Sequence, residues 1–467
     1  MIDSGSEPDT LTVSGFIVAT SSIDVHLGEG RDRLLVTGTM NAPEITIYGE
    51  ADNDTISLNV YYPTKQLTGH VTVLGGDGTD RITVNRMHSR TDILDLDGQG
   101  GRDLYYINTR GGNTDELTQI YDTGASGVDE VIIRGTAEDD VFLLRAMAIP
   151  DQTTPDTGFV AKLNEGGAEI ERFNYCGIEG ITLNTLYGDD YVASDDTLVV
   201  FTINGGVGND RFQIGQVFKS QRDDNPETAN IDEYDMFATI EITRGWLSNG
   251  ISFPMTINGG DGNDEFTVFH NKAVLTLNGG DGDDMFTVRA FALAGSTDSE
   301  RARTDMKGDA GADTIRYALN APVGIDGGDG FDTVTVIGTE FADDFVVTDH
   351  GVFGAGLNIT YVNIERVRVD GAEGDDRFFV LSTDADVVTE IDGGLGSDSF
   401  FVGGSPSDAP IPVISRDLRG YSGVILHEVE SADLLYEGIT VDSISANVAD
   451  NEVPFIVVTE SGGVSVV

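Results

Sequence analysis

Apolar residues in this chain recur at every second position in short runs, and each run ends at a glycine-rich segment. Met255 and Ile257 lead into one such segment, and Phe266 and Val268 follow it. An alternation of period two is the burial pattern of a β-strand with one face in a core. No sustained apolar spacing of three and four residues occurs, and glycines interrupt the windows where a helix could form. The pattern predicts an all-β protein built from strand, turn and strand.

The glycine-rich segments share the hexapeptide G-G-x-G-x-D, whose sixth residue we call the closing Asp. Residues two and four positions after every closing Asp are apolar, which places a strand directly after each turn. Six copies are intact, and six more keep the closing Asp and most of the glycines. The intact copies close at Asp80, Asp210, Asp264, Asp284, Asp332 and Asp398, and the degenerate copies at Asp32, Asp54, Asp103, Asp129, Asp313 and Asp376.

The spacing of the closing Asp residues predicts the architecture. Intervals between residues 32 and 129 are 22 to 26 residues, and the interval from 376 to 398 is 22. A repeat of about 20–25 residues that holds two or three short strands is typical of one coil of a parallel β-solenoid. We therefore expect a parallel β-helix, or β-solenoid, with glycine- and Asp-rich turns and about one such turn in each coil.

The repeats suggest three regions. Residues 1–22 are an expected N-terminal edge or cap, residues 23–435 the solenoid, and residues 436–467 C-terminal strands that start or join a following β-module. Polar segments predict loops that leave the solenoid near residues 150–158, 220–250 and 292–305.

A longer and weaker duplication spans several repeats. Its corresponding segments are 133–144 and 336–347, 173–190 and 359–376, and 199–215 and 387–403. The C-terminal strands stop without a capping element, and the N-terminus lacks a basic and apolar leader. We therefore expect a piece of a much longer secreted chain.

Composition and charge narrow the classes of function. Of 467 residues, 80 are Asp or Glu and 27 are Lys or Arg, which gives a net charge of −53. This charge argues against binding to nucleic acid or to an anionic membrane surface, because both need basic side chains. No apolar run is long enough for membrane insertion, and a single Cys excludes an internal disulfide framework. The 22 Phe and 14 Tyr argue against a disordered acidic chain.

The turn motif itself suggests a cation site. Glycine permits positive φ and lets backbone carbonyls face a common point, while Asp adds a hard anionic oxygen. Oxygen-only ligands in a flexible loop suit Ca²⁺ better than Mg²⁺ or Zn²⁺. A divalent cation would also offset the repulsion between closing carboxylates on coils about 4.8 Å apart. The alternative is a metal-free turn in which Asp makes only Asx-type hydrogen bonds.

These turns resemble the RTX, or hemolysin-type, calcium-binding repeats over roughly residues 23–404. The resemblance implies Ca²⁺ held between coils by the closing Asp and by turn carbonyls. Because the motifs here do not run in immediate tandem, we expect one edge of calcium sites and not a two-sided β-roll. The expected metal ligands are Asp77, Asp80, Asp103, Asp210, Asp261, Asp264, Asp281, Asp284, Asp313, Asp329, Asp332, Asp376 and Asp398, to which the more degenerate copies add Asp32, Asp54 and Asp129.

The chain also resembles calcium-binding modules of giant bacterial surface proteins and adhesins. We therefore expect a stalk, spacer or adhesive module of a large secreted bacterial protein, extracellular or at the cell surface, that Ca²⁺ stiffens after export. Its expected partners are neighbouring modules of the same chain, together with a cell-surface glycan or another surface protein. Two alternatives stay open: a polysaccharide-binding or polysaccharide-active β-helix of lyase or epimerase type, and an S-layer or filament subunit.

Residues that could carry catalysis are few and scattered, so we do not expect an enzyme. Asp349 and His350 lie in a glycine-flanked turn, and Arg366 and Arg368 alternate on a strand as on an exposed face. Cys176 lies between apolar neighbours, and we expect a small buried side chain there. No nucleophile-elbow, zinc-protease or P-loop motif occurs in the sequence.

Overall fold

A computed structural model places this chain in β-strands joined by turns. The chain folds as two compact units, Met1–Asp284 (unit 1) and Met285–Val467 (unit 2). No helix occurs in the described part of the chain, and so none there could cross a membrane. The described residues are 1–59, 67–85, 93–110, 116–124, 126–147, 157–218, 239–242, 245–289, 303–318, 322–354, 357–403, 419–425 and 444–450.

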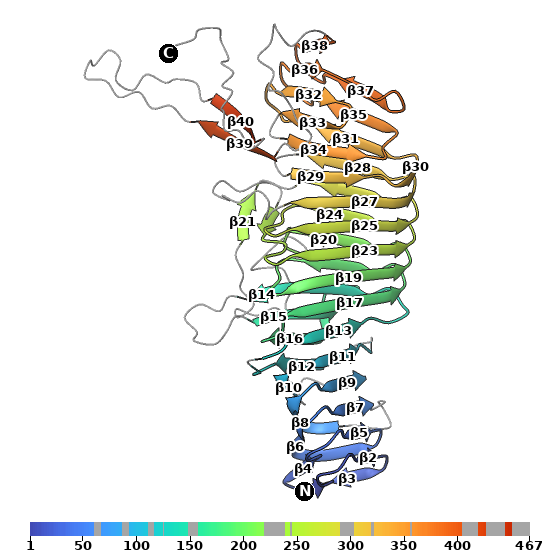
Figure 1. The fold of residues 1–467 in the computed structure, drawn as a ribbon, viewed down its shortest axis with the longest axis vertical. Coiled ribbons are helices and arrows are strands. Elements are labelled where there is room, and N and C mark those ends of the chain that lie inside the picture. The colour runs from blue at the N-terminus through green and yellow to red at the C-terminus, as the bar shows by residue number, and fades with distance from the viewer. Residues whose placement is uncertain are drawn as a thin grey trace, which may run out of the picture. The chain divides into compact units, whose positions relative to one another are not determined.

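Unit 1 contains two long sheets, and successive strands along the chain mostly alternate between them (Figure 1). The first comprises β1 (Ile2–Asp3), β3 (Phe16–Val18), β4 (Ser22–His26), β6 (Thr39–Ala51), β8 (Leu67–Gly78), β10 (Leu94–Gly101), β12 (Glu116–Tyr121), β14 (Val141–Met147), β15 (Thr157–Leu163), β16 (Glu169–Cys176), β18 (Tyr191–Ser194), β20 (Arg211–Ile214) and β24 (Glu265–Val268). The second comprises β2 (Thr10–Val13), β5 (Arg33–Val36), β7 (Thr55–Asn59), β9 (Arg81–Asn85), β11 (Leu104–Asn108), β13 (Glu130–Arg134), β17 (Gly180–Tyr187), β19 (Val200–Val207), β23 (Met255–Asp261) and β25 (Leu275–Asp281).

Unit 2 is built in the same way. One set of strands comprises β26 (Met285–Val288), β28 (Thr314–Ala318), β31 (Thr333–Ile337), β35 (Arg366–Asp370) and β37 (Val388–Asp392). The other comprises β27 (Thr304–Gly311), β29 (Pro322–Asp326), β30 (Asp329–Gly330), β32 (Asp344–Thr348), β33 (Gly351–Gly354), β34 (Leu357–Val362), β36 (Arg377–Val380) and β38 (Ser399–Val402).

Strand pairing follows the sequence repeat, which confirms the all-β prediction with long parallel sheets. In unit 1, β23 pairs in parallel with β19 and β25, so that Ile257 lies between Ile203 and Leu277. All three side chains are fully buried, while their sequence neighbours, such as Thr256 and Asn258 on β23, are partly exposed. Phe212 and Phe266 stack at 4.9 Å between ring centroids on the neighbouring strands β20 and β24. Each repeat thus adds one layer to a continuous apolar core.

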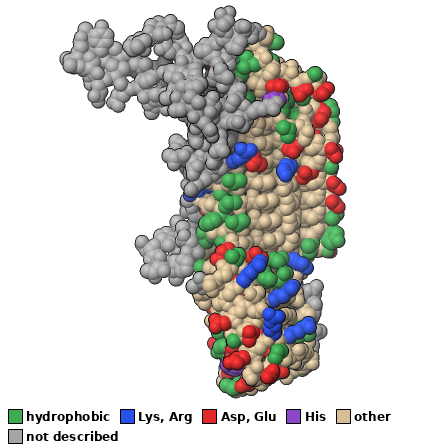
Figure 2. All heavy atoms as spheres, in the orientation of Figure 1, with side chains coloured by type: hydrophobic (Ala, Val, Ile, Leu, Met, Phe, Trp, Pro, Cys, Tyr) green, Lys and Arg blue, Asp and Glu red, His purple; other side chains and the backbone are tan. Residues whose placement is uncertain are grey.

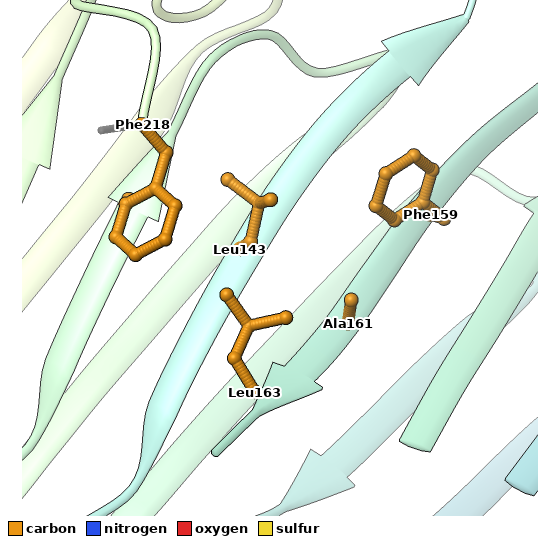
Figure 3. Close-up of a cluster of buried hydrophobic side chains, with 6 residues drawn as sticks. Leu143, Phe159, Ala161, Leu163 and Phe218 are labelled. Carbon is orange, nitrogen blue, oxygen red and sulfur yellow. The ribbon is translucent and has the colours of Figure 1, made fainter. Parts of the chain in front are cut away.

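An antiparallel excursion interrupts the parallel order of the long sheets in unit 1. β14, β15 and β16 form an antiparallel meander, which β12 and β18 flank in parallel. Figure 3 shows the buried cluster on this meander, where Leu143 of β14 lies beside Leu163 of β15. The cluster consists of Leu143, Phe159, Ala161, Leu163, Ala193 and Phe218. The apolar faces of the meander therefore pack as a second, local core.

The predicted duplication is confirmed by strand pairing. In unit 2, β32, β33 and β34 form the same kind of antiparallel meander, and β32 pairs in parallel with β36 as β14 does with β18. Thr136 donates its N–H to Asp140 Oδ2 at 2.7 Å, and Thr339 donates its N–H to Asp343 Oδ2 at 2.7 Å. The two copies therefore agree down to single hydrogen bonds.

The predicted loops and C-terminal strands lie largely outside the described residues. Within the segment 220–250, β21 (Thr239–Ile242) and β22 (Gly245–Ser248) form an antiparallel hairpin, and Leu247 is buried. Thr304, at the end of the third predicted loop, already belongs to β27. Of the segment 436–467, only β40 (Ile444–Asp450) is described, antiparallel to β39 (Arg419–Ile425).

Candidate metal centre

The first glycine of the motif faces the closing carboxylate of its own turn. A Cβ on Gly205 would lie 2.2 Å from Asp210 Oδ2 and 2.5 Å from the carbonyl oxygen of Gly259 in the next repeat. A Cβ on Gly259 would likewise lie 2.0 Å from Asp264 Oδ2. No side chain fits in that space, which explains the glycine. A carboxylate oxygen and a carbonyl oxygen therefore face the same small space.

The second and third glycines are required by close stacking on the preceding repeat. Gly260 has φ of 120°, and a Cβ there would lie 2.1 Å from the carbonyl oxygen of Gly206. Gly262 has φ of 136°, and its Cβ would lie 1.9 Å from the carbonyl oxygen of Gly208. Both conformations are rare for L side chains, and both contacts are too short for a carbon atom.

The closing Asp residues form a buried hydrogen-bonded chain that we call the inner ladder. In most repeats the closing Asp donates its backbone N–H to Oδ1 of the closing Asp in the next repeat. Asp54 donates to Asp80 at 2.7 Å, and Asp80 donates to Asp103 at 2.7 Å. In unit 2, Asp376 donates to Asp398 at 3.0 Å. One oxygen of each acceptor carboxylate is thus used by the fold, as the metal-free alternative anticipates.

Sequence reasoning missed several members of the inner ladder. Asp140 donates its N–H to Asp190 Oδ1 at 2.7 Å, and Asp343 donates to Asp376 Oδ1 at 2.7 Å. These turns lack the full glycine pattern, but each contains two consecutive Asp residues followed by an apolar alternation. That pair of Asp residues is the signal that would have found them.

Glutamate takes the place of the closing Asp where a repeat follows a meander. The N–H of Asp129 donates to Glu179 Oε2 at 2.6 Å, and the N–H of Asp332 donates to Glu365 Oε2 at 2.7 Å. The motif pattern gives no sign of this replacement. The longer side chain still reaches the same N–H group, so the ladder continues.

A second chain of hydrogen bonds, the outer ladder, runs through the fifth motif position. The N–H of Asn209 donates to Asp189 Oδ1 at 2.8 Å, and the N–H of Asn263 donates to Asn209 Oδ1 at 2.9 Å. Here the later repeat donates to the earlier one, which is the opposite polarity to the inner ladder. The recurrent Asn or Asp before the closing Asp thus has a structural reason that the sequence analysis did not identify.

The structure divides the predicted metal ligands into two sets. Closing residues are buried: Asp32, Asp54, Asp80, Asp103, Asp129, Asp210, Asp264, Asp284, Asp313, Asp332 and Asp376, with Asp398 partly exposed. The predicted third-position ligands are all exposed: Asp77, Asp261, Asp281 and Asp329. Figure 2 shows acidic side chains exposed on the face drawn there. Only the closing set has the burial expected of a dehydrated cation site.

Several buried closing carboxylates keep one oxygen without a hydrogen-bond partner. Burial raises the pKa of Asp54, Asp103 and Asp210 to about 7, and that of Asp80 and Asp264 to about 6. The partnerless oxygens are Oδ2 of Asp32, Asp54, Asp80, Asp103, Asp190, Asp210, Asp264, Asp332 and Asp376. A buried anionic oxygen with no donor favours binding of either a proton or a cation.

The residues considered for catalysis lie at the surface. His350 Nε2 is 3.2 Å from Asp349 Oδ2 in the turn between β32 and β33, and both side chains are partly exposed. On β35, Arg368 forms an exposed ion pair with Asp392 at 3.1 Å. Cys176, expected to be buried, is partly exposed, because it alternates on β16 with the buried Phe173 and Tyr175 and so lies on the outward face. A scan of protein-family models and a search of curated proteins found no match to this chain.

Proposed function

We propose that this chain is a calcium-binding structural module. The observation that carries the proposal is the row of buried Oδ2 atoms without a hydrogen-bond partner in nine repeats. Burying an anion without a partner is costly, and a native fold rarely repeats such a cost. A cation that neutralises these oxygens turns the cost into cohesion between repeats.

The donor set fits Ca²⁺. The residues that would hold it are the closing Asp, through Oδ2, and the first glycine of the next repeat, through its carbonyl oxygen. Asp80 with Gly98, Asp210 with Gly259, and Asp376 with Gly393 provide such pairs, since both oxygens face the first glycine of the turn. Hard oxygen donors suit Ca²⁺, which would supply charge neutralisation and crosslinking of repeats.

The same proposal extends to the architecture of the module and to its role. Parallel sheets that gain one layer per repeat favour a β-solenoid, and its turns resemble RTX repeats. Such a module would serve as a stalk, spacer or adhesive segment of a secreted bacterial protein. Outside the cell, calcium at millimolar concentration would stabilise it by mass action, whereas low cytosolic calcium would leave the carboxylates uncompensated.

Thermal unfolding followed by circular dichroism tests the proposal. At pH 7.5, we expect a markedly higher Tm in 5 mM Ca²⁺ than in EDTA, since each site filled at about 100 times its Kd adds about 2.7 kcal/mol. Equal concentrations of Mg²⁺ should have a smaller effect, because Mg²⁺ gives up its water reluctantly. The same Tm in Ca²⁺ and in EDTA would reject the proposal.

The pH dependence in EDTA is a second prediction. The pKa of Asp54, Asp103 and Asp210 is raised to about 7, so the folded chain binds protons that the unfolded chain, at pKa 3.8, releases. Their protonation therefore stabilises the fold fully below about pH 4, and this stabilisation is lost as pH rises through about 7. We expect Tm in EDTA to fall between pH 5 and pH 8, and Ca²⁺ to abolish most of that fall. A Tm in EDTA that rises over this range would contradict the burial of these carboxylates.

A further inference from the structure

Asp122 brings an additional carboxylate into the turn edge of unit 1. β10 and β12 pair in parallel, with Leu96 opposite Ile120, so Gly98 and Asp122 each follow two residues later. Gly98 is the first glycine of its turn, and the Asp103 carboxylate fills the space that a Cβ there would need. The repeat of Asp122 therefore carries an acid where its neighbour carries a glycine.

This substitution gathers three buried acids. Asp103, Asp122 and Asp129 each present a carboxylate oxygen within 4.8 Å of the others. Asp103 is fully buried, Asp129 is 3% exposed and Asp122 is 7% exposed. Asp103 Oδ1 accepts the N–H of Asp80, but its Oδ2 has no hydrogen-bond partner and lies against Gly98. A buried, partnerless oxygen thus points at the position where the next repeat carries Asp122.

The chain holds Asp122 in place without neutralising it. Tyr105, fully buried, donates its hydroxyl to Asp122 Oδ2 at 2.6 Å, and Gly124 donates its N–H to Asp122 Oδ1 at 2.8 Å. Both donors are uncharged. The acid is therefore fixed in orientation by donors that carry no positive charge.

Basic side chains compensate other buried acids of the same unit. Arg145 Nε lies 2.6 Å from Asp195 Oδ2, and Lys162 Nζ lies 2.6 Å from Asp140 Oδ1, with every one of these side chains at most 4% exposed. Around the three-acid cluster, as far as the chain is described, the charges that act on Asp103 are carboxylates. No described Lys, Arg or His forms an ion pair with Asp103, Asp122 or Asp129.

We propose that Asp103, Asp122 and Asp129 form a distinct centre for one hard divalent cation of the Ca²⁺ class, separate from the two-oxygen sites of the regular turns. Three carboxylates in a buried space, with no His or Cys donor among the described residues of the group, select oxygen-seeking ions. The centre rests on the proposed function for the identity of the ion. The three-acid centre offers the ion more carboxylate ligands than a regular turn does. It should therefore bind the ion with higher affinity than the regular turns.

Calcium titration by calorimetry, together with Tb³⁺ as a luminescent substitute, tests the centre in the full chain. Tyr105 lies next to Asp122 and should sensitise Tb³⁺ emission there. We expect Asp122→Asn to lose the tightest Ca²⁺ and with it a component of tyrosine-sensitised emission. Tyr105→Phe should lose the same emission component and keep the Ca²⁺ stoichiometry. Asp122→Gly, which restores the residue found at this register in β10, guards against misfolding, and Asp264→Asn is the control in a regular turn.

The outcomes separate the two proposals. No calcium binding by the unmodified chain would reject the proposed function and this centre together. Calcium binding with unchanged stoichiometry and tight affinity in both Asp122→Asn and Asp122→Gly would reject the centre and leave the proposed function standing. Sensitised emission that survives Tyr105→Phe unchanged would also reject the centre, because no ion would then lie beside that hydroxyl. Loss of the tight site in both Asp122 variants, with Asp264→Asn retaining it, would establish the centre.

Discussion

The two copies of the duplicated block treat the same buried acid differently. Asp140 in unit 1 and Asp343 in unit 2 occupy matching places, and each accepts hydrogen bonds from a threonine four residues earlier. In unit 1, the seven-residue strand β15 brings Lys162 to within 2.6 Å of Asp140. In unit 2, β33 has only four residues, and among the described residues no basic side chain pairs with Asp343.

This difference shows that the ladders do not depend on how an acid is neutralised. Asp140 and Asp343 both donate their N–H to the next closing carboxylate at 2.7 Å. A longer meander allows the chain to supply its own ammonium group, while a short one leaves the carboxylate to its hydrogen bonds. Burial accordingly raises the pKa of Asp343, and the Thr339 hydrogen bonds only partly oppose that rise. Unit 1 thus pairs this acid with a lysine, whereas unit 2 surrounds the matching acid with hydrogen bonds only, as far as the structure describes it.

The largest effect should come from removing the internal cation. Lys162→Met leaves Asp140 buried without its partner, which typically costs about 3–5 kcal/mol. Urea unfolding in EDTA measures the loss for unit 1, and the double variant Lys162→Met with Asp140→Asn should recover much of it. In unit 2, Arg377→Met removes an exposed partner of Asp344, and we expect at most about 1 kcal/mol. Equal losses in the two units would mean that Lys162 is not the neutralising group.

A smaller effect, with a change of sign, should come from one closing residue in each unit, Asp210 in unit 1 and Asp376 in unit 2. Asp210→Asn and Asp376→Asn keep an acceptor for the inner ladder and replace the partnerless oxygen by an amide that can donate to the next carbonyl. In EDTA at pH 7.5, we expect each to stabilise by about 1 kcal/mol. In Ca²⁺, each should destabilise, because a ligand charge is lost. Chemical denaturation in EDTA and in Ca²⁺ measures the change in the free energy of unfolding. A change of the same sign under both conditions would refute a cation shared between repeats.

The smallest effect should come from the outer ladder. Asn209→Ala and Asp375→Ala each remove an exposed acceptor of a backbone N–H in the next repeat, at 2.9 Å and 2.8 Å. Water can replace an exposed acceptor, so we expect about 0.5–1 kcal/mol in either copy, with little dependence on Ca²⁺. The urea midpoint measures this, and a strong calcium dependence would place the cation on the outer side of the turn.

Much of the fold could be read from the sequence because its repeat is regular. The apolar alternation around Ile257 and Phe266 predicted two strands per turn, and both side chains are fully buried in parallel sheets. The sequence singled out the closing Asp residues by their recurrence, but their burial was found only in the structure. The intact motif does not ensure burial by itself, because Asp398, which closes an intact copy, is partly exposed.

Which acids are buried and which of them come together could not be predicted, because both depend on contacts between repeats that a linear motif does not record. Asp77 and Asp80 look equivalent as ligands in the sequence, but one faces solvent and the other the interior. Asp122 matches no motif position and becomes notable only through its register with Gly98. Glu179 likewise joins the ladder across a 50-residue separation that the meander occupies.

The direction in which the two ladders run has a mechanical consequence. Within a unit, both ladders link one repeat to the next, as the hydrogen bonds of the parallel sheets do. A pulling force along the stacking direction loads these bonds in tension and not in shear, so repeats would peel off one at a time. Asp190 and Asp210 are separated by 20 residues, and releasing that length frees about 70 Å of extended chain. The calcium-binding module proposed above would then yield in steps under load, and bound Ca²⁺ would raise the force that each step needs.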